Sequence, residues 1–219
     1  MGRQWVWQEI QACLTSHLPT NRGVLITGCP GSGKTAIILN LVDRSCFGAP
    51  AVREAVREGG GAGGEEQVRL LADQVVAYHF CQADNAPTCL VPEFLQSLAG
   101  QLSQAPQLRS YHHLLQAQPD ILAQLSLANC QSNPSQALLA GVLQPLRDLY
   151  EEGKVNTKLA ILLIDGLCEA EQHRPDYGET LTSFLAKHHS QFPPWLKIVC
   201  TVRSNMGEIL NSFPFHRAW

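Results

Sequence analysis

A glycine-rich turn between an apolar run and an amphipathic segment constrains this chain more than any other feature. Residues 28–35 read GCPGSGKT and match the pattern G-x-x-x-x-G-K-[ST] in full. The apolar residues 24–27 before the turn predict a short strand, and apolar residues at helical spacing after it predict a helix. A strand, a glycine-rich turn and a helix in this order are typical of a loop that wraps a polyphosphate with backbone N–H groups.

Each residue type in this loop has a physical reason to be there. Lys34 supplies positive charge to the β- and γ-phosphates, and the hydroxyl of Thr35 is placed to coordinate Mg²⁺. The helix that begins near Gly33 offers unpaired N–H groups and the positive end of its dipole. We therefore expect ATP with Mg²⁺, although no motif distinguishes ATP from GTP. The residues expected to contact the nucleotide are Gly28, Cys29, Pro30, Gly31, Ser32, Gly33, Lys34 and Thr35.

Two further strand ends carry the remaining candidate residues. The apolar run 159–164 ends at Asp165 and predicts a parallel strand buried on both faces, with a carboxylate that holds Mg²⁺ beside Thr35. Glu169 either orients or deprotonates the water that attacks the γ-phosphate, or is a solvated acid at the start of a helix. Arg203 ends a third apolar strand, where it either senses the γ-phosphate or lies at the surface.

The rest of the chain alternates strands with helices, which predicts an α/β fold. We expect a P-loop NTPase core, a three-layer αβα sandwich with a mainly parallel sheet. Residues 1–22 are expected to form an N-terminal helical segment and 23–219 the core, with a flexible glycine-rich insertion at 48–66. The other expected elements are a helix at 5–17, strands at 75–81 and 197–203, a helical region at 91–150 broken near Pro106, Pro119 and Pro134, and helices at 178–189 and 205–211.

Composition excludes several classes of function. A net charge of -3 gives no basic field for nucleic acid, and no run approaches the ~18 apolar residues of a membrane span. Eight cysteines without a CxxC pair favour reduced thiols in a cytoplasmic protein over a disulfide framework. His79, Cys81 and Cys89 could share a zinc ion, but no second close pair completes such a site. Charged residues are only 16% of the chain, which fits buried parallel strands and surfaces covered by something else.

These motifs in this order resemble the STAND class of P-loop NTPases near the NACHT group. The strand at 75–81 then corresponds to an additional strand, as in ATPases with an added central strand. The chain is similar in more detail to the TANC family, over almost its whole length apart from the glycine-rich loop. The stretches that carry this similarity are residues 5–7, 21–24, 76–85, 89–94, 163–171 and 193–197.

The TANC resemblance implies an ATP-binding module within a large postsynaptic scaffold that also carries tetratricopeptide repeats, ankyrin repeats and a coiled coil. It implies the cytoplasm of dendritic spines, the postsynaptic density and protein partners of such a scaffold. Cys168 stands where NACHT proteins usually have an acid, and the family's helical lid is expected to be missing after Arg203. A regulatory switch with slow or no hydrolysis is therefore favoured, while an active Mg-dependent ATPase and a scaffold domain with a vestigial loop remain alternatives.

Overall fold

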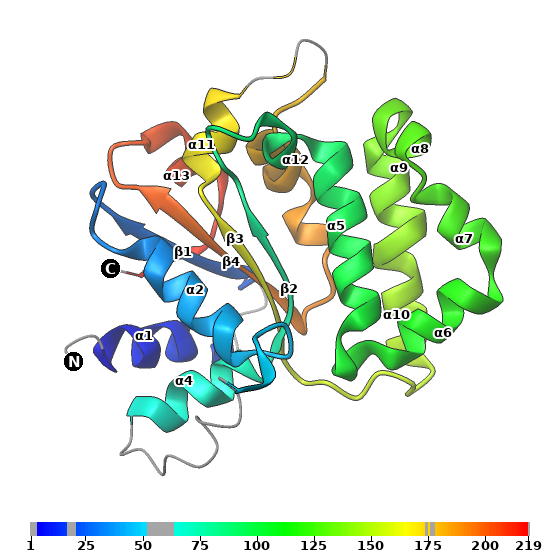
Figure 1. Ribbon diagram of the computed structural model, residues 1–219, viewed down its shortest axis with the longest axis horizontal. Coiled ribbons are helices and arrows are strands. Elements are labelled where there is room, and N and C mark those ends of the chain that lie inside the picture. Colours follow the sequence, from blue (N-terminus) through cyan, green and yellow to red (C-terminus); the bar gives the residue numbers. More distant parts are fainter. Residues whose placement is uncertain (1–3, 17–20, 52–63, 174, 176–177, 219) are drawn as a thin grey trace.

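In the computed structural model, a parallel five-stranded sheet runs through the middle of the molecule (Figure 1). The structure describes residues 4–16, 21–51, 64–173, 175 and 178–218. The strand order is β2-β3-β4-β1-β5, and each neighbouring pair is parallel. This confirms the predicted α/β fold with a parallel sheet. The strands are β1 (Gly23–Gly28), β2 (Val75–Phe80), β3 (Ala160–Asp165), β4 (Leu196–Arg203) and β5 (His216–Ala218).

Helices cover both faces of the sheet and complete the three layers. One face carries α1 (Gln4–Thr15), α2 (Lys34–Arg44) and α4 (Gly64–Ala72). The other face carries α5 (Val91–Gln104), α11 (Leu167–Gln172), α12 (Leu181–His188) and α13 (Gly207–Ser212). Beyond α5, and in the same apolar cluster, lie α6 (Arg109–Ala117), α7 (Pro119–Gln124), α8 (Leu127–Ser132), α9 (Pro134–Leu138) and α10 (Gln144–Glu151). Short helical turns η1 (Ala86–Cys89), η2 (Pro106–Leu108), η3 (Leu139–Leu143) and η4 (His189–Gln191) join them.

The alternation of side chains along β3 shows why both layers are needed. Ile161 and Leu163 pack with the α1, α2 and α4 layer, whereas Leu162 and Ile164 pack with the layer of α5 to α13. All four are at most 1% exposed, because β3 lies between β2 and β4 and is covered on both sides. A strand in this position has no solvated face, so its sequence is a continuous apolar run.

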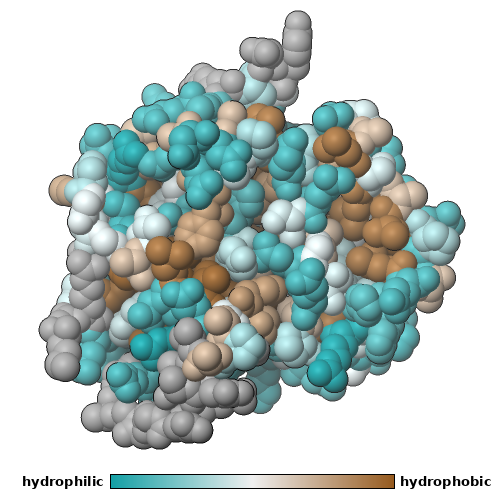
Figure 2. Space-filling model, in the orientation of Figure 1, coloured by the Kyte–Doolittle hydropathy of each residue, from teal (hydrophilic) through white to brown (hydrophobic). Residues whose placement is uncertain are grey.

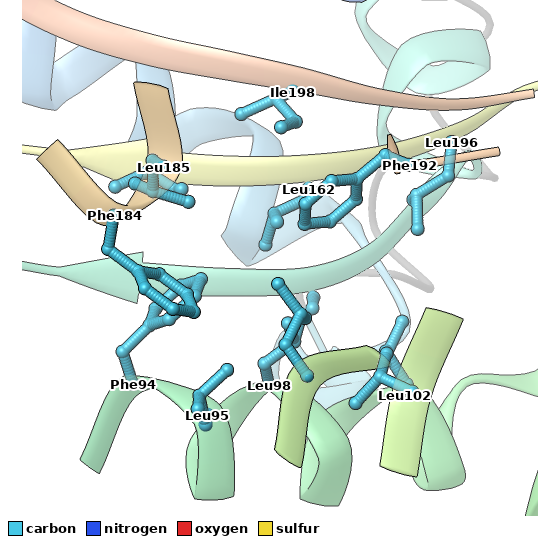
Figure 3. Close-up of a cluster of buried hydrophobic side chains, with 14 of the residues drawn as sticks. Phe94, Leu95, Leu98, Leu102, Leu162, Phe184, Leu185, Phe192, Leu196 and Ile198 are labelled. Carbon is cyan, nitrogen blue, oxygen red and sulfur yellow. The ribbon is translucent and has the colours of Figure 1, made fainter. Parts of the chain in front are cut away.

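Large apolar side chains fill the space between the sheet and the second helical layer. Figure 3 shows Phe94, Leu98 and Leu102 of α5 pointing toward the sheet, and these side chains belong to the same buried cluster as Leu162 and Ile198. The edge of the Phe94 ring also packs against His79 of β2, with ring centroids 5.2 Å apart. Helix α5 is thus anchored by a periodic row of apolar side chains, as helical spacing predicts.

The structure differs from the sequence-based expectations in three places. The strand at 75–80 lies at the edge of the sheet, and the position between β1 and β3 belongs to β4. Residues 216–218, which no apolar pattern marks, form β5 beside β1. Of the predicted insertion at 48–66, residues 52–63 lie outside the described part, and helix α4 begins at Gly64.

Several large hydrophobic side chains remain exposed despite this packing. Trp5, Leu39 and Leu70 lie on α1, α2 and α4, and Leu122 and Leu127 lie on α7 and α8. Figure 2 shows hydrophobic side chains gathered over the region of α7 to α9. Among the described helices, none has the length and apolar character required to cross a bilayer.

We expect Phe94→Ala to lower the free energy of unfolding by about 3–5 kcal/mol, because it removes a fully buried ring from the contact between α5 and β2. Urea denaturation followed by circular dichroism measures this change. Leu122→Ala is the control, since its side chain is 54% exposed and its loss should change stability by less than about 0.5 kcal/mol. Equal effects of the two substitutions would contradict the described core.

Candidate functional site

The carboxyl ends of four strands meet at one edge of the sheet, beside a cavity of about 350 Å³. In the strand register, Gly28 pairs with Arg203 and Phe80 pairs with Asp165. Helix α2 leaves β1 toward one face of the sheet, whereas the helices after β3 and β4 lie on the other face. Connections that separate in this way leave a crevice between β1 and β4, which is where ligands bind in open parallel sheets.

The loop at 28–35 curls tightly between β1 and α2. Gly33, which precedes the helix, has a φ of 94°, a left-handed conformation that favours glycine. The ammonium of Lys34 donates hydrogen bonds to the carbonyls of Gly28 and Cys29, at 2.8 and 3.0 Å. Of the eight residues predicted to contact a nucleotide, those that line the cavity are Pro30, Gly31, Lys34 and Thr35.

The carboxylate of Asp165 connects the 28–35 loop to β4 through hydrogen bonds. Its Oδ2 accepts a hydrogen bond of 2.8 Å from the hydroxyl of Thr35, and its Oδ1 accepts one of 2.6 Å from Thr201. The same Thr201 hydroxyl accepts a hydrogen bond of 2.9 Å from the backbone N–H of Gly166. The two candidate Mg²⁺ ligands of the sequence, Thr35 and Asp165, are thus brought into direct contact although 130 residues separate them.

Asp165 is 6% exposed, and its burial raises the pKa of the carboxyl above the ordinary value. The hydrogen bonds from Thr201 and Thr35 oppose this shift, because they stabilise the charged form. The negative charge of Glu169 raises the pKa further, while the positive charge of Lys34 lowers it. The site therefore holds a poorly solvated negative charge that a cation would stabilise.

The turn after Asp165 depends on Gly166. Its φ of 81° is again left-handed, and a Cβ at this position would lie 2.7 Å from the carbonyl oxygen of Cys81. The same Cβ would lie 3.1 Å from Oε2 of Glu169. A side chain at Gly166 would therefore disturb both the end of β2 and the acid that follows in α11.

Glu169 and Arg203 line the cavity and form an ion pair with each other, between Oε1 and Nη2. Both side chains are partly buried. The backbone N–H of Arg203 donates a 3.1 Å hydrogen bond to the sulfur of Cys168, and burial raises the pKa of that thiol. Burial therefore favours the neutral thiol of Cys168 at the start of α11.

Thr201 is the site residue that sequence reasoning missed. Its only signal was a hydroxyl in an otherwise apolar strand, two residues before Arg203. For His79, which the sequence does not favour as a zinc ligand with Cys81 and Cys89, the structure places Nε2 2.6 Å from the carbonyl oxygen of Thr88. No group of three or more His, Cys, Asp or Glu side chains suited to a metal occurs in the described ranges, and all eight cysteines, which lie within these ranges, are outside any disulfide.

Comparison with known proteins identifies the domain. The family model described as Nephrocystin 3, N-terminal, matches residues 2–203, which contain the 28–35 loop, Asp165, Glu169 and the end of β4. No solved structure matches the chain.

We expect Asp165→Asn to stabilise the protein relative to wild type, by an amount that grows as the pH rises. Burial raises the pKa of Asp165 in the folded state above the ordinary value of 3.8. The stability that protonated Asp165 contributes is therefore fully present below pH 3.8, and it is lost as the pH rises through the raised pKa. Asparagine cannot ionise, its oxygen still accepts the Thr201 hydrogen bond, and its NH₂ group can donate to the Thr35 hydroxyl in place of the bond that Oδ2 accepts. Urea unfolding between about pH 3 and pH 7 measures the difference.

Thr201→Val is compared with Asp165→Asn in the same urea unfolding experiment, because it removes a hydrogen bond to the carboxylate and leaves the carboxylate in place. It should destabilise the protein by about 1–3 kcal/mol at neutral pH, because it leaves a buried carboxylate and the Gly166 N–H without this partner. A difference between Asp165→Asn and wild type that does not change with pH would contradict the raised pKa.

Proposed function

The chain belongs to the nephrocystin 3 N-terminal family, and on that basis we propose that it is a module that binds ATP with Mg²⁺ at the carboxyl edge of its sheet. The observation that carries this proposal is the 2.8 Å contact between Thr35, in the loop at 28–35, and Asp165 at the end of β3. A glycine-rich loop that opens a helix, next to a carboxylate on a neighbouring strand end, is the arrangement that phosphate and its metal require.

The polyphosphate would lie along the start of α2. There the first backbone N–H groups of the helix have no partners within it and carry the positive end of its dipole. Lys34 holds its ammonium against two loop carbonyls and would turn from them toward the β- and γ-phosphates. The cavity of about 350 Å³ is of the size that small ligands occupy.

The residues present fit Mg²⁺. The hydroxyl of Thr35 and the carboxylate of Asp165 supply the oxygen ligands that this ion prefers, and Mg²⁺ usually takes few ligands from the protein and the rest from phosphate and water. When bound, the ion would neutralise phosphate charge. Thr201 would keep the carboxylate oriented through its 2.6 Å hydrogen bond.

We propose that turnover is slow, so that the module acts as a regulatory switch. Glu169 is the side chain suited to orient or deprotonate an attacking water, but its carboxylate is engaged by Arg203. The ion pair occupies Oε1, so only Oε2 is left to accept the proton of an attacking water. Cys168, a buried neutral thiol, does not supply a second carboxylate.

An active Mg-dependent ATPase is the alternative, since Glu169 and Arg203 both line the cavity. In that case a nucleotide would draw Arg203 toward the γ-phosphate and release Glu169 for the water. A third alternative is a scaffold domain in which the loop at 28–35 no longer binds nucleotide. Direct binding and turnover measurements separate the three.

The cellular setting that we propose rests on the resemblance to the TANC family. In it the domain is part of a cytoplasmic scaffold at the postsynaptic density of dendritic spines. The nucleotide state would then bias how attached repeats engage their protein partners.

We expect Lys34→Ala to weaken binding of Mg-ATP at least about tenfold, or roughly 1.4 kcal/mol, because it removes the cation that faces the phosphates. Isothermal titration calorimetry measures the affinity. Lys154→Ala is the control, since the side chain of Lys154 is 61% exposed and lies outside the cavity. The vestigial alternative is supported if wild-type protein does not bind Mg-ATP, and equal affinity of wild type and Lys34→Ala argues against this site.

We expect Glu169→Gln to bind Mg-ATP as wild type does and to leave an already slow phosphate release nearly unchanged. Phosphate release under multiple-turnover conditions measures this, with Glu208→Gln as a control on the exposed surface of α13. Removal of a working general base typically costs 10²- to 10⁴-fold in rate. A fall of that size in Glu169→Gln alone would establish the ATPase alternative in place of the switch.

A further inference from the structure

A second cavity, of about 470 Å³, lies at the opposite edge of the sheet. Arg22 immediately precedes β1, Lys158 precedes β3, and Trp195 immediately precedes β4, so the cavity is formed at the amino ends of the strands. The last turns of α10 supply Arg147, Tyr150 and Glu151, which is the acidic residue among those that line the cavity. This edge takes no part in the proposed nucleotide site.

The backbone around this cavity is fixed to the sheet. The carbonyl of Arg22 accepts a 3.0 Å hydrogen bond from the N–H of Ile198, and the carbonyl of Trp195 accepts a 2.7 Å hydrogen bond from Ala160. The guanidinium of Arg147 donates to the carbonyl of Gln191. The backbone of Arg22 and the guanidinium of Arg147 are thus held in place before any ligand arrives, which lowers the entropic cost of binding.

The cavity is positively charged on a chain whose net charge is -3. Arg22, Arg147 and Lys158 line it against the single acid Glu151, and none of the three cations is paired with a carboxylate of the described residues. A fourth cation, Lys197, lies next to Arg22 and is 8% exposed. Burial lowers the pKa of Lys197, and the positive charge of Arg22 lowers it further.

An aromatic and proline surface lies among these cations. Tyr150 stacks on Trp195, with ring centroids 5.5 Å apart and an angle of 21° between the planes. Trp195 is 5% exposed and Tyr150 is 43% exposed, so the buried ring supports one that is open to solvent. Pro193 and Pro194 continue the surface. Such a rigid apolar surface suits an aliphatic or proline side chain.

We propose that this cavity binds an acidic peptide segment of a partner protein, with its carboxylates on Arg22, Arg147 and Lys158 and an apolar side chain on Tyr150. The chemistry favours a peptide over a phosphate ligand. The stacked Tyr150–Trp195 pair and the prolines place an apolar surface beside the cations, which an acidic peptide with apolar side chains can use and inorganic phosphate cannot. Because the two sites lie at opposite edges of the sheet, the domain can hold a peptide whether or not nucleotide is bound.

Fluorescence anisotropy with the 219-residue chain tests this proposal. The probe is a labelled peptide that alternates glutamate with leucine and proline, and its counterpart carries glutamine in place of glutamate. We expect binding of the glutamate peptide, at least about tenfold weaker binding of the glutamine peptide, and weaker binding as salt is raised. Failure of the glutamate peptide to bind, or equal binding of both peptides, would overturn the proposal.

Substitutions of residues that line the cavity test whether the glutamate peptide binds there. Arg147→Glu combined with Lys158→Glu should weaken the glutamate peptide at least about tenfold, and Tyr150→Ala should weaken it severalfold. Lys158→Glu alone serves if the double variant does not fold by circular dichroism. Arg109→Glu, which reverses one charge as Lys158→Glu does but at an exposed residue outside the cavity, should have no effect. Unchanged binding by the folded cavity variants would refute the site.

Two further arms keep this proposal separate from the nucleotide proposal. Lys34→Ala should bind the peptide as wild type does, so that loss of ATP binding and loss of peptide binding are distinguishable. Inorganic phosphate at millimolar concentration should displace the peptide no more than chloride of the same ionic strength does. Specific displacement by phosphate would identify a phosphate site and overturn the peptide assignment.

Discussion

The two hydrogen bonds that Asp165 accepts hold the carboxyl edge of the sheet together. Burying a carboxylate costs free energy unless it is hydrogen-bonded. The folded protein therefore depends on the hydroxyls of Thr35 and Thr201, which donate the hydrogen bonds that stabilise Asp165 at the end of β3. Thr35 opens α2 and Thr201 lies in β4, hence the carboxylate joins the loop after β1 to the neighbouring strand end. The position of the 28–35 loop relative to the cavity depends on these two hydrogen bonds to Asp165.

The parallel sheet gives the molecule two chemically different edges. At the carboxyl edge, a glycine-rich loop, a helix start and a buried carboxylate suit phosphate and a divalent cation. At the amino edge, prolines and a stacked Tyr150–Trp195 pair lie among cations and suit an acidic chain with apolar side chains. Because all strands run the same way, each kind of strand end is collected on its own edge, and one domain can carry both sites.

The low fraction of charged residues has a structural explanation in part. Buried strands such as β3 are apolar on both faces, and two separate apolar clusters fill the spaces between the sheet and its helical layers. Exposed side chains on α1, α2, α4, α7 and α8, Leu39 and Leu122 among them, account for further apolar surface. Partner segments or attached domains that cover such surfaces would complete the explanation.

The sequence by itself determined the α/β class, the strands around residues 75–80, 160–165 and 196–203, and the loop at 28–35, because continuous apolar runs and glycine spacing are local signals. It also indicated Asp165, which directly follows such a run. Only the tertiary structure decided that β4 lies between β1 and β3, that residues 216–218 add an edge strand, and that Glu169 pairs with Arg203. Those outcomes depend on which strands become neighbours and on contacts between residues far apart in the chain, neither of which leaves a periodic mark in the sequence.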